Sequence, residues 1–103
     1  MLLAQVLGTV VSTRKDRGLL SLKLMLTREL DGSFQPTGNF VVAADAVGAG
    51  VDEVVLLAQG SSARMTEVSR EKPVDAVIVG IVDAVEIQGK DAYLKRTANA
   101  RRD

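Results

Sequence analysis

The segment Asp45-Ala-Val-Gly-Ala-Gly-Val-Asp-Glu-Val-Val-Leu-Leu-Ala-Gln-Gly-Ser-Ser-Ala-Arg64 decides the fold, because in it three glycines and two serines surround one short apolar strand. We expect that strand to cover residues 53–58. Gly48 and Gly50 precede it, and a glycine there supplies a positive φ or lets another backbone approach where a Cβ would clash. A neighbouring subunit is one candidate for what approaches. The segment therefore predicts a subunit contact surface and not a catalytic pocket.

The end of this segment predicts a single helical turn with a polar start. Ser61 and Ser62 follow Gly60, and their hydroxyls can cap free backbone N–H groups at the start of a turn at residues 63–65. A turn start of this kind attracts anions weakly. One interpretation is a capped turn that merely ends the strand.

Apolar runs between turn-forming residues predict strands on both sides of this segment. Residues 2–11 are rich in Leu and Val, and residues 40–44 form a short strand after a loop at residues 31–39. Leucine occupies every second position from Leu20 to Leu26, which predicts a half-buried strand with the leucines on one face. A turn at residues 89–91 leads into a last strand at residues 92–96.

Residues 74–86 are apolar on both faces for most of their length, as expected of a strand covered by its own barrel and by a neighbour. Asp75 and Asp83 flank the apolar part, where an unpaired buried carboxylate would be costly. We therefore expect at least one of them to find a basic or backbone N–H partner. The basic candidates are Arg14, Lys15 and Arg64.

Six short strands with few helical signals predict an all-β fold, namely a small barrel or sandwich. The nearest architecture is an oligonucleotide-binding-like (OB-like) β-barrel with a short helical turn. We expect residues 1–96 to form this single domain. Residues 97–103 are expected to be a polar tail that is poorly ordered.

The composition excludes several classes of function. The 103-residue chain has neither cysteine nor histidine, which excludes disulfides and thiolate metal sites and removes the commonest metal ligand and neutral-pH acid/base group. We predict no catalytic residue, no metal site and no cofactor. Thirteen basic and thirteen acidic residues cancel, so the broad positive field used to bind nucleic acid is missing.

The apolar segments predict a cytoplasmic protein that does not enter a membrane. Residues 1–5 reach a polar residue too soon for the apolar region of a signal peptide. The longest apolar run, residues 76–82, is far shorter than the roughly 20 residues that span a bilayer.

Three segments carry a family resemblance: Gly8-Thr-Val-Val-Ser-Thr-Arg-Lys15, residues 44–64, and Pro73-Val-Asp-Ala-Val-Ile-Val-Gly-Ile-Val-Asp83. Together they resemble the CcmL/EutN family, the pentameric vertex proteins of bacterial microcompartment shells such as carboxysomes and ethanolamine-utilisation compartments. The resemblance covers most of the chain, from residue 1 to about residue 85. The departures lie in residues 31–39, in residues 65–72 and after residue 86, so the particular compartment stays open.

The resemblance implies a structural, non-enzymatic barrel that closes into a fivefold ring and caps the vertices of a polyhedral shell. The implied partners are other copies of this chain and hexameric or trimeric shell proteins, with no nucleic acid and no membrane. It also implies a second interpretation of the turn after Gly60, as the lining of a narrow central opening. Inward guanidinium groups there would favour small anions. The candidates for that lining are Gly60, Ser61, Ser62, Ala63 and Arg64.

The candidates for the subunit contact come from the glycine segment and from the 74–86 strand. They are Asp45, Val47, Gly48, Ala49, Gly50, Asp75, Val77, Val79 and Asp83.

Two other classes of function stay open. One is an OB-like barrel that binds single-stranded nucleic acid or an oligosaccharide, as barrels of this type often do. Against it, only Phe34, Phe40 and Tyr93 are available for stacking on bases. The other is a small enzyme, which a deep pocket with convergent carboxylates would support.

Overall fold

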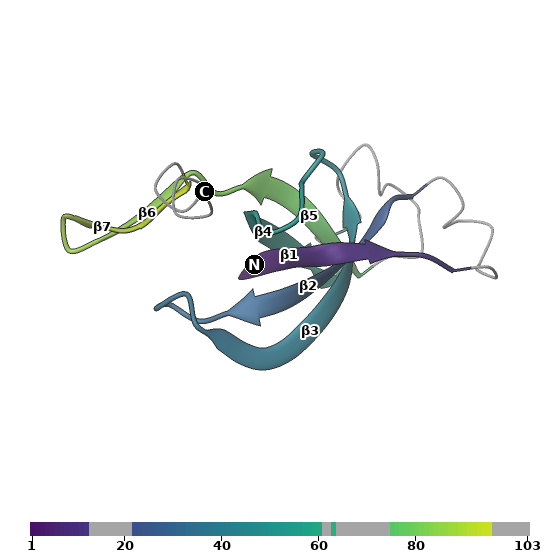
Figure 1. The fold of residues 1–103 in the computed structure, drawn as a ribbon, viewed down its shortest axis with the longest axis horizontal. Helices are drawn as coiled ribbons and strands as arrows, with labels where there is room; N and C mark the ends of the chain where they lie inside the picture. Colours follow the sequence, from purple (N-terminus) through teal and green to yellow (C-terminus); the bar gives the residue numbers. More distant parts are fainter. Residues whose placement is uncertain (13–21, 61–62, 64–74, 96–103) are drawn as a thin grey trace.

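The structure, a computed structural model, describes residues 1–12, 22–60, 63 and 75–95. These residues form β-strands joined by turns and loops (Figure 1). The strands are β1 (Leu2–Val10), β2 (Leu24–Leu30), β3 (Pro36–Asp45), β4 (Val54–Gln59), β5 (Ala76–Ile81), β6 (Ala84–Ile87) and β7 (Lys90–Leu94).

Five of these strands close into a barrel in the order β1-β2-β3-β5-β4, and β4 pairs back onto β1. Four of the five pairings are antiparallel. The fifth, between β3 and β5, is parallel and consists only of Ala44 opposite Val77 and Asp45 opposite Ile78. The predicted all-β barrel is therefore confirmed, and its closure depends on one short contact.

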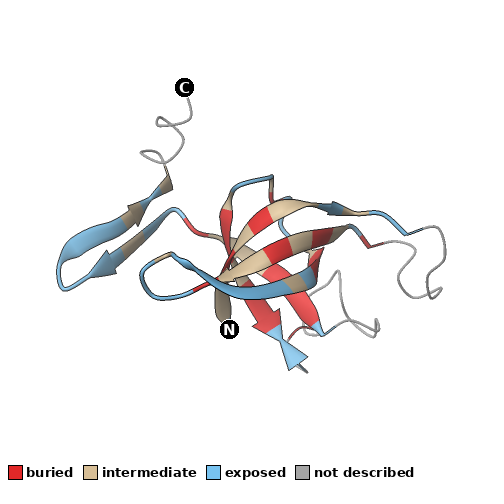
Figure 2. Cartoon of the chain, turned by 60° about the horizontal axis from the view of Figure 1, so that its bottom comes forward, coloured by how far each residue is buried: buried red, intermediate tan, exposed pale blue. Residues whose placement is uncertain are grey.

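The barrel interior is small and is filled mainly by alanine and by medium-sized side chains. Its buried cluster consists of Ala4, Val6, Met25, Ala43, Ala49, Val55, Leu57, Ala76 and Ile78. Buried and partly buried residues alternate along the strands, as Figure 2 shows. Thr27 is also fully buried, and its hydroxyl donates a hydrogen bond of 2.8 Å to the Val41 carbonyl, so the buried polar group is satisfied.

The alternating leucines of β2 lie on the outer face of the barrel. Met25 and Thr27 point inward, whereas Leu24 and Leu26 are only partly buried. The period-two pattern was thus sufficient to predict a strand but not to decide which face enters the core. The narrow interior explains this outcome, because Met25 and Thr27 already fill the space that β2 can reach.

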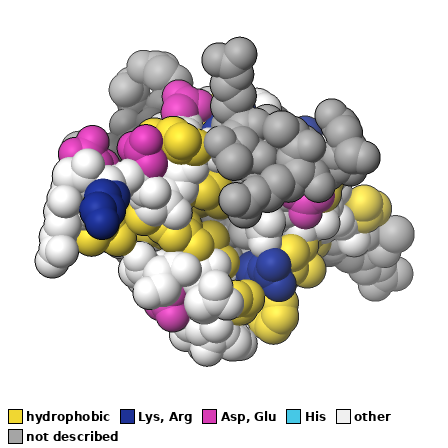
Figure 3. Space-filling view, turned by 60° about the vertical axis from the view of Figure 1, so that its left-hand side comes forward, with side chains coloured by type: hydrophobic (Ala, Val, Ile, Leu, Met, Phe, Trp, Pro, Cys, Tyr) yellow, Lys and Arg dark blue, Asp and Glu magenta, His cyan; other side chains and the backbone are white. Residues whose placement is uncertain are grey.

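Two further apolar clusters lie outside the barrel and are covered by the chain itself. One contains Leu22, Ala44, Ala63 and Val77. The other contains Leu30, Val54 and Val82, with Phe34, Val85 and Tyr93 packed against it. Hydrophobic side chains also reach the surface in patches at the end where the hairpin projects (Figure 3).

The strand expected at residues 74–86 is divided in two. β5 ends at Ile81, and β6 begins at Ala84 after a break at Val82 and Asp83. The outer face of β5 at Val77 is covered by Ala63 of the same chain, so no neighbour is needed there. The strand was expected to be covered on one face by a neighbouring subunit, but at Val77 a residue of the same chain covers that face.

Strands β6 and β7 form a hairpin that projects away from the barrel (Figure 1). Its turn residues Gln88 and Gly89 both have positive φ, which matches the twist of a two-residue hairpin. Tyr93 stacks on Phe34 with ring centroids 5.4 Å apart. Lys95 Nζ lies 2.6 Å from Glu53 Oε2 in the loop before β4. The expected polar tail lies outside the described residues.

The loop between β2 and β3 is shorter than expected, because β3 already begins at Pro36. Asp31 stabilises it by accepting hydrogen bonds from the backbone N–H groups of Ser33 and Gln35. In the part of the chain that the structure describes, no helix is long and apolar enough to cross a bilayer.

Truncating a core side chain should destabilise the fold much more than the same truncation on the hairpin. Leu57→Ala removes a fully buried side chain from the barrel interior, so we expect unfolding free energy to fall by about 2–5 kcal/mol. Leu94→Ala, on a partly exposed leucine, is the matched control and should cost clearly less. Denaturant unfolding at one fixed protein concentration measures both, and equal losses would contradict this core.

The hairpin anchor should respond to alkaline and not to neutral pH. The hydrogen bond from Lys95 to Glu53 raises the pKa of Lys95 above its ordinary value of 10.5. A raised folded-state pKa gives a contribution that is complete below the unfolded pKa and is lost as pH rises through the folded one. Between about pH 7 and 9 Lys95 stays charged, because this range lies well below the ordinary lysine pKa of about 10.5. We therefore expect the protection of the hairpin amides against hydrogen exchange to stay constant over this range and to fall only at more alkaline pH.

Lys95→Met should accelerate hydrogen exchange in β6 and β7 severalfold, because the partly exposed ion pair is weak but local. Lys90→Met, at the exposed start of β7, is the matched control. Equal exchange rates in the two variants would rule out the anchor.

Candidate functional site

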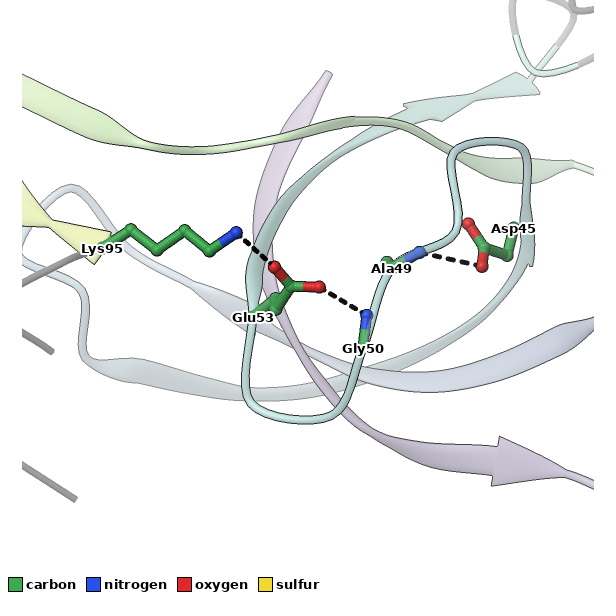
Figure 4. A network of polar contacts seen from close by, with 5 residues as sticks. All are labelled: Asp45, Ala49, Gly50, Glu53 and Lys95. Atoms are coloured by element: carbon green, nitrogen blue, oxygen red, sulfur yellow. Dashed lines mark hydrogen bonds and ion pairs between the residues drawn. The ribbon is translucent and has the colours of Figure 1, made fainter. Parts of the chain in front are cut away.

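The candidate site is the 45–53 loop, which joins β3 to β4 across one end of the barrel (Figure 4). Asp45 Oδ1 accepts hydrogen bonds from the backbone N–H groups of Val47 and Gly48, each 3.0 Å long. Its Oδ2 accepts one from Ala49, also 3.0 Å long. One carboxylate therefore satisfies three successive backbone donors that the tight turn leaves unpaired.

The two glycines of the loop are needed for two different reasons. Gly48 has φ of +77°, which residues with a Cβ rarely adopt. Gly50 has an ordinary φ, but a Cβ there would lie 3.2 Å from Glu53 Oε1. The predicted reasons, positive φ and close approach, are thus both present. The group that approaches Gly50 belongs to the same chain and not to a neighbouring subunit.

Glu53 links the loop to the hairpin. Its Oε1 accepts a 2.6 Å hydrogen bond from the Gly50 N–H, and its Oε2 forms the ion pair with Lys95 (Figure 4). The backbone on either side of Glu53 continues the pairing with β1, because the Val6 N–H donates to the Glu53 carbonyl and the Asp52 N–H donates to the Val6 carbonyl. The loop is therefore fixed to β1, to the hairpin and to itself.

Ala49 directs its methyl group into the barrel. It is 2% exposed and belongs to the interior cluster with Val55 and Leu57. The loop consequently closes one end of the barrel and presents Val47 and Gly48 to solvent on its other side.

The structure separates the predicted contact residues into three groups. Ala49 and Val77 are buried within the chain, so their side chains have no surface left to offer. Val47, Gly48, Asp75 and Asp83 are exposed, and Asp45, Gly50 and Val79 are partly buried. Asp75, Val77 and Val79 belong to the β5 side of the barrel, Asp83 precedes the hairpin, and the others belong to the loop.

Asp75 and Asp83 do not carry the buried charges that the sequence suggested. Both are exposed, because Asp75 lies just before β5 and Asp83 lies in the break after it, where each carboxylate reaches water. Their backbone carbonyls accept hydrogen bonds, from the Gly60 N–H at Asp75 and from the Lys95 N–H at Asp83. The three basic candidates, Arg14, Lys15 and Arg64, lie outside the described residues.

The candidates for a central opening are only partly described. Gly60 is exposed with φ of +63°, and Ala63 is fully buried in an outer cluster. Ser61, Ser62 and Arg64 lie outside the described residues.

Sequence reasoning missed the roles of Glu53 and Lys95. Glu53 was expected only as the first residue of a strand. Its position three residues after Gly50 was the one signal in the sequence for the hydrogen bond between the Gly50 N–H and its carboxylate. Lys95 is 42 residues away, since 95 minus 53 is 42, and nothing in the local pattern indicates that contact.

The polar groups of the site serve the backbone and the hairpin. Within residues 1–12, 22–60, 63 and 75–95, no group of three or more Asp and Glu residues could hold a metal ion. The described carboxylates Asp45 and Glu53 accept hydrogen bonds from neighbouring N–H groups. The loop is therefore a fixed surface element.

Comparison with known proteins gives the same family from sequence and from structure. The chain matches the family model described as ethanolamine utilisation protein EutN/carboxysome over residues 1–83. It is 48% identical over 96 residues to the carboxysome shell vertex protein CcmL of Synechocystis sp., covering 93% of this chain and 96% of that protein. It is 43% identical over 95 residues to the bacterial microcompartment shell vertex protein EutN of Salmonella typhimurium, covering 92% and 96%.

Two solved structures show the same barrel. A carboxysome subunit, CcmL, has a TM-score of 0.90 at 48% identity, covering 93% of this chain and 100% of that chain. GrpN, a pentameric microcompartment shell protein from Rhodospirillum rubrum, has a TM-score of 0.75 at 44% identity, covering 84% and 98%. A family model that spans most of the chain, with relatives that match it nearly end to end, establishes that this chain belongs to the EutN/CcmL family.

Proposed function

We propose that this chain is a structural subunit of a bacterial microcompartment shell, which forms a homopentamer at the shell vertices and is not an enzyme. The observation that carries the proposal is its near end-to-end match, at 48% identity, to a carboxysome shell vertex protein. The pentameric state of GrpN supports the ring. The shell places the protein in the cytoplasm, and its expected neighbours there are hexameric or trimeric shell proteins.

A ring of identical subunits requires two different surfaces on each subunit, joined head to tail. We assign one of them to the exposed part of the 45–53 loop together with the β5 side of the barrel. Val47, Gly48 and Val79 supply its apolar part, and Asp75 and Asp83 lie at its ends. A loop whose backbone donors are already satisfied can be covered by a neighbour without leaving unpaired N–H groups.

The residues 60–64 are proposed to line a narrow opening at the centre of the ring. Gly60 has exposed surface for this role, and Ala63 contributes packing behind it. Five copies of Arg64 at such an opening would favour small anions over cations.

A nucleic-acid-binding barrel is the weaker proposal. Phe34 and Tyr93 stack on each other at the base of the hairpin, so two of the three aromatic side chains are engaged within the chain. The net charge of zero also gives no general attraction for phosphate.

Native mass spectrometry of the purified chain should give a species of five subunits. The expected mass is about five times the 10.9 kDa of one chain. The species should persist on dilution, because a ring in which each subunit makes two contacts resists the loss of any one subunit. A stable monomer or dimer across micromolar concentrations would contradict the proposal.

Asp45→Ala should weaken both the loop and the ring. The substitution removes the acceptor for three backbone N–H groups, and we expect the free energy of unfolding to fall by about 1–3 kcal/mol. The pentamer should dissociate at higher protein concentration than the unaltered chain. Asp91→Ala, at an exposed site on the hairpin, is the matched control and should change neither quantity. Thermal unfolding and native mass spectrometry provide the two measurements.

A further inference from the structure

The outer face of β1, β2 and β3 carries a row of apolar residues that the register places side by side. Gly8 lies opposite Leu26, and Leu26 lies opposite Val42. In the next row Arg28 lies opposite Phe40. Residues directly opposite each other in neighbouring strands point to the same face. We call Gly8, Leu26, Phe40 and Val42 the outer stripe.

The outer stripe is the part of this face that the chain leaves uncovered. At one end the face carries Ala44, buried in the cluster with Ala63, and at the other end Leu30, buried in the cluster beneath the hairpin. Between them Phe40 is 63% exposed and Val42 is 47% exposed. Figure 2 shows that most of β3 is exposed, from the turn after β2 up to its buried end at Ala43 and Ala44. Two large apolar side chains standing this close together in solvent are typical of a contact surface.

Gly8 adds an independent observation. Its φ is not positive, and a Cβ built on it would meet no atom of the chain within 4 Å. Neither reason that explains Gly48 and Gly50 therefore applies to Gly8. Gly8 lies at the bulge in the pairing of β1 with β2, and its missing side chain leaves open space where a second backbone has room to approach.

The edge of β3 beside the stripe is also open. β3 pairs with β5 only at Ala44 and Asp45, so in the described chain residues 36–43 have a paired strand on one side only. The open edge is nevertheless held in shape. Glu29 Oε2 accepts hydrogen bonds from Asn39 Nδ2 and from the Thr37 hydroxyl, and these bonds lower the pKa of Glu29.

The charged side chain next to the outer stripe, Arg28, already has a hydrogen-bond partner in the same chain. Arg28 donates two hydrogen bonds to Gln5 Oε1, 2.9 and 2.7 Å long. Gln5 in turn donates to the Asp52 carbonyl at the end of the 45–53 loop. An apolar partner can therefore cover the stripe without leaving this guanidinium unpaired.

We propose that the outer stripe is the second surface of the ring and receives the loop and β5 side of the next copy of this chain. This inference rests on the proposed function. β2 lies between β1 and β3 in the closed barrel, and β4 and β5 form the opposite wall. Two apolar surfaces on opposite walls satisfy the head-to-tail geometry that a closed ring demands. Val47, Gly48 and Val79 on the neighbour would face Gly8, Leu26, Phe40 and Val42.

A charge introduced into the stripe tests the proposal. Val42→Asp should fold as the unaltered chain does, because the side chain is half exposed, yet it should raise the concentration for half-assembly at least about a hundredfold. Ile87→Asp on the hairpin is the matched control, because Ile87 is also 47% exposed. Circular dichroism checks the fold and native mass spectrometry checks the assembly. Equal assembly of the two variants would overturn the proposal.

Cross-linking tests which two surfaces meet. The chain has no cysteine, so introduced thiols are unique. A Val42→Cys/Val47→Cys double variant treated with a short bismaleimide should give covalent species up to the pentamer on a denaturing gel. A mixture of the two single variants should stop at the dimer, and Val42→Cys/Ile87→Cys should give no ladder.

The possible failures are distinguishable. A monomeric unaltered chain would overturn the proposed function itself. A pentameric unaltered chain with no ladder in the Val42→Cys/Val47→Cys variant would overturn only the assignment of the stripe. Dimers from Val42→Cys alone would show that two stripes face each other, which also contradicts the head-to-tail contact.

Discussion

The narrow interior of the five-stranded barrel is the constraint on which the rest of the structure depends. The diameter of a β-barrel grows with the number of its strands, so a barrel of only five strands encloses little space. Alanines and a few medium-sized side chains fill that space here. The chain is 47% hydrophobic, and the remaining apolar residues must therefore lie outside the barrel. Ala63 and the hairpin cover the two outer clusters, whereas the outer stripe is left for another molecule. Assembly thus follows from the size of the core.

Polar chemistry in this chain serves the shape of its surface. Asp45 satisfies three backbone donors of the loop, and Glu53 joins the loop to the hairpin through Lys95. Each contact holds a backbone segment in one conformation, and a segment fixed in advance has less conformational entropy to lose when a neighbour binds. Carboxylates are common candidates for catalytic groups. In this chain, however, the carboxylates of Asp45 and Glu53 accept hydrogen bonds from neighbouring backbone N–H groups. This use of polar residues agrees with a structural role in a shell.

The sequence was sufficient for the strands and for the family but not for contacts across the barrel. Turn residues and period-two alternation located β1 to β4 within a few residues. Alternation pointed to the leucines of β2 as the core face, but the residues that β2 buries inside the barrel are Met25 and Thr27 of the more polar face. The break at Val82 was missed because a continuous apolar run hides the point where the chain leaves the barrel. The link from Glu53 to Lys95 depends on tertiary folding and has no local signal.

The exposure of the outer stripe in the assembled protein tests the central claim most directly. A crystal or cryo-electron microscopy structure of the assembly gives the exposed fractions of Phe40 and Val42, which are 63% and 47% in the single chain. The account predicts that both fall below about a tenth, as in the fully buried core of an interface. Side chains that keep their single-chain exposure within a closed ring would contradict it.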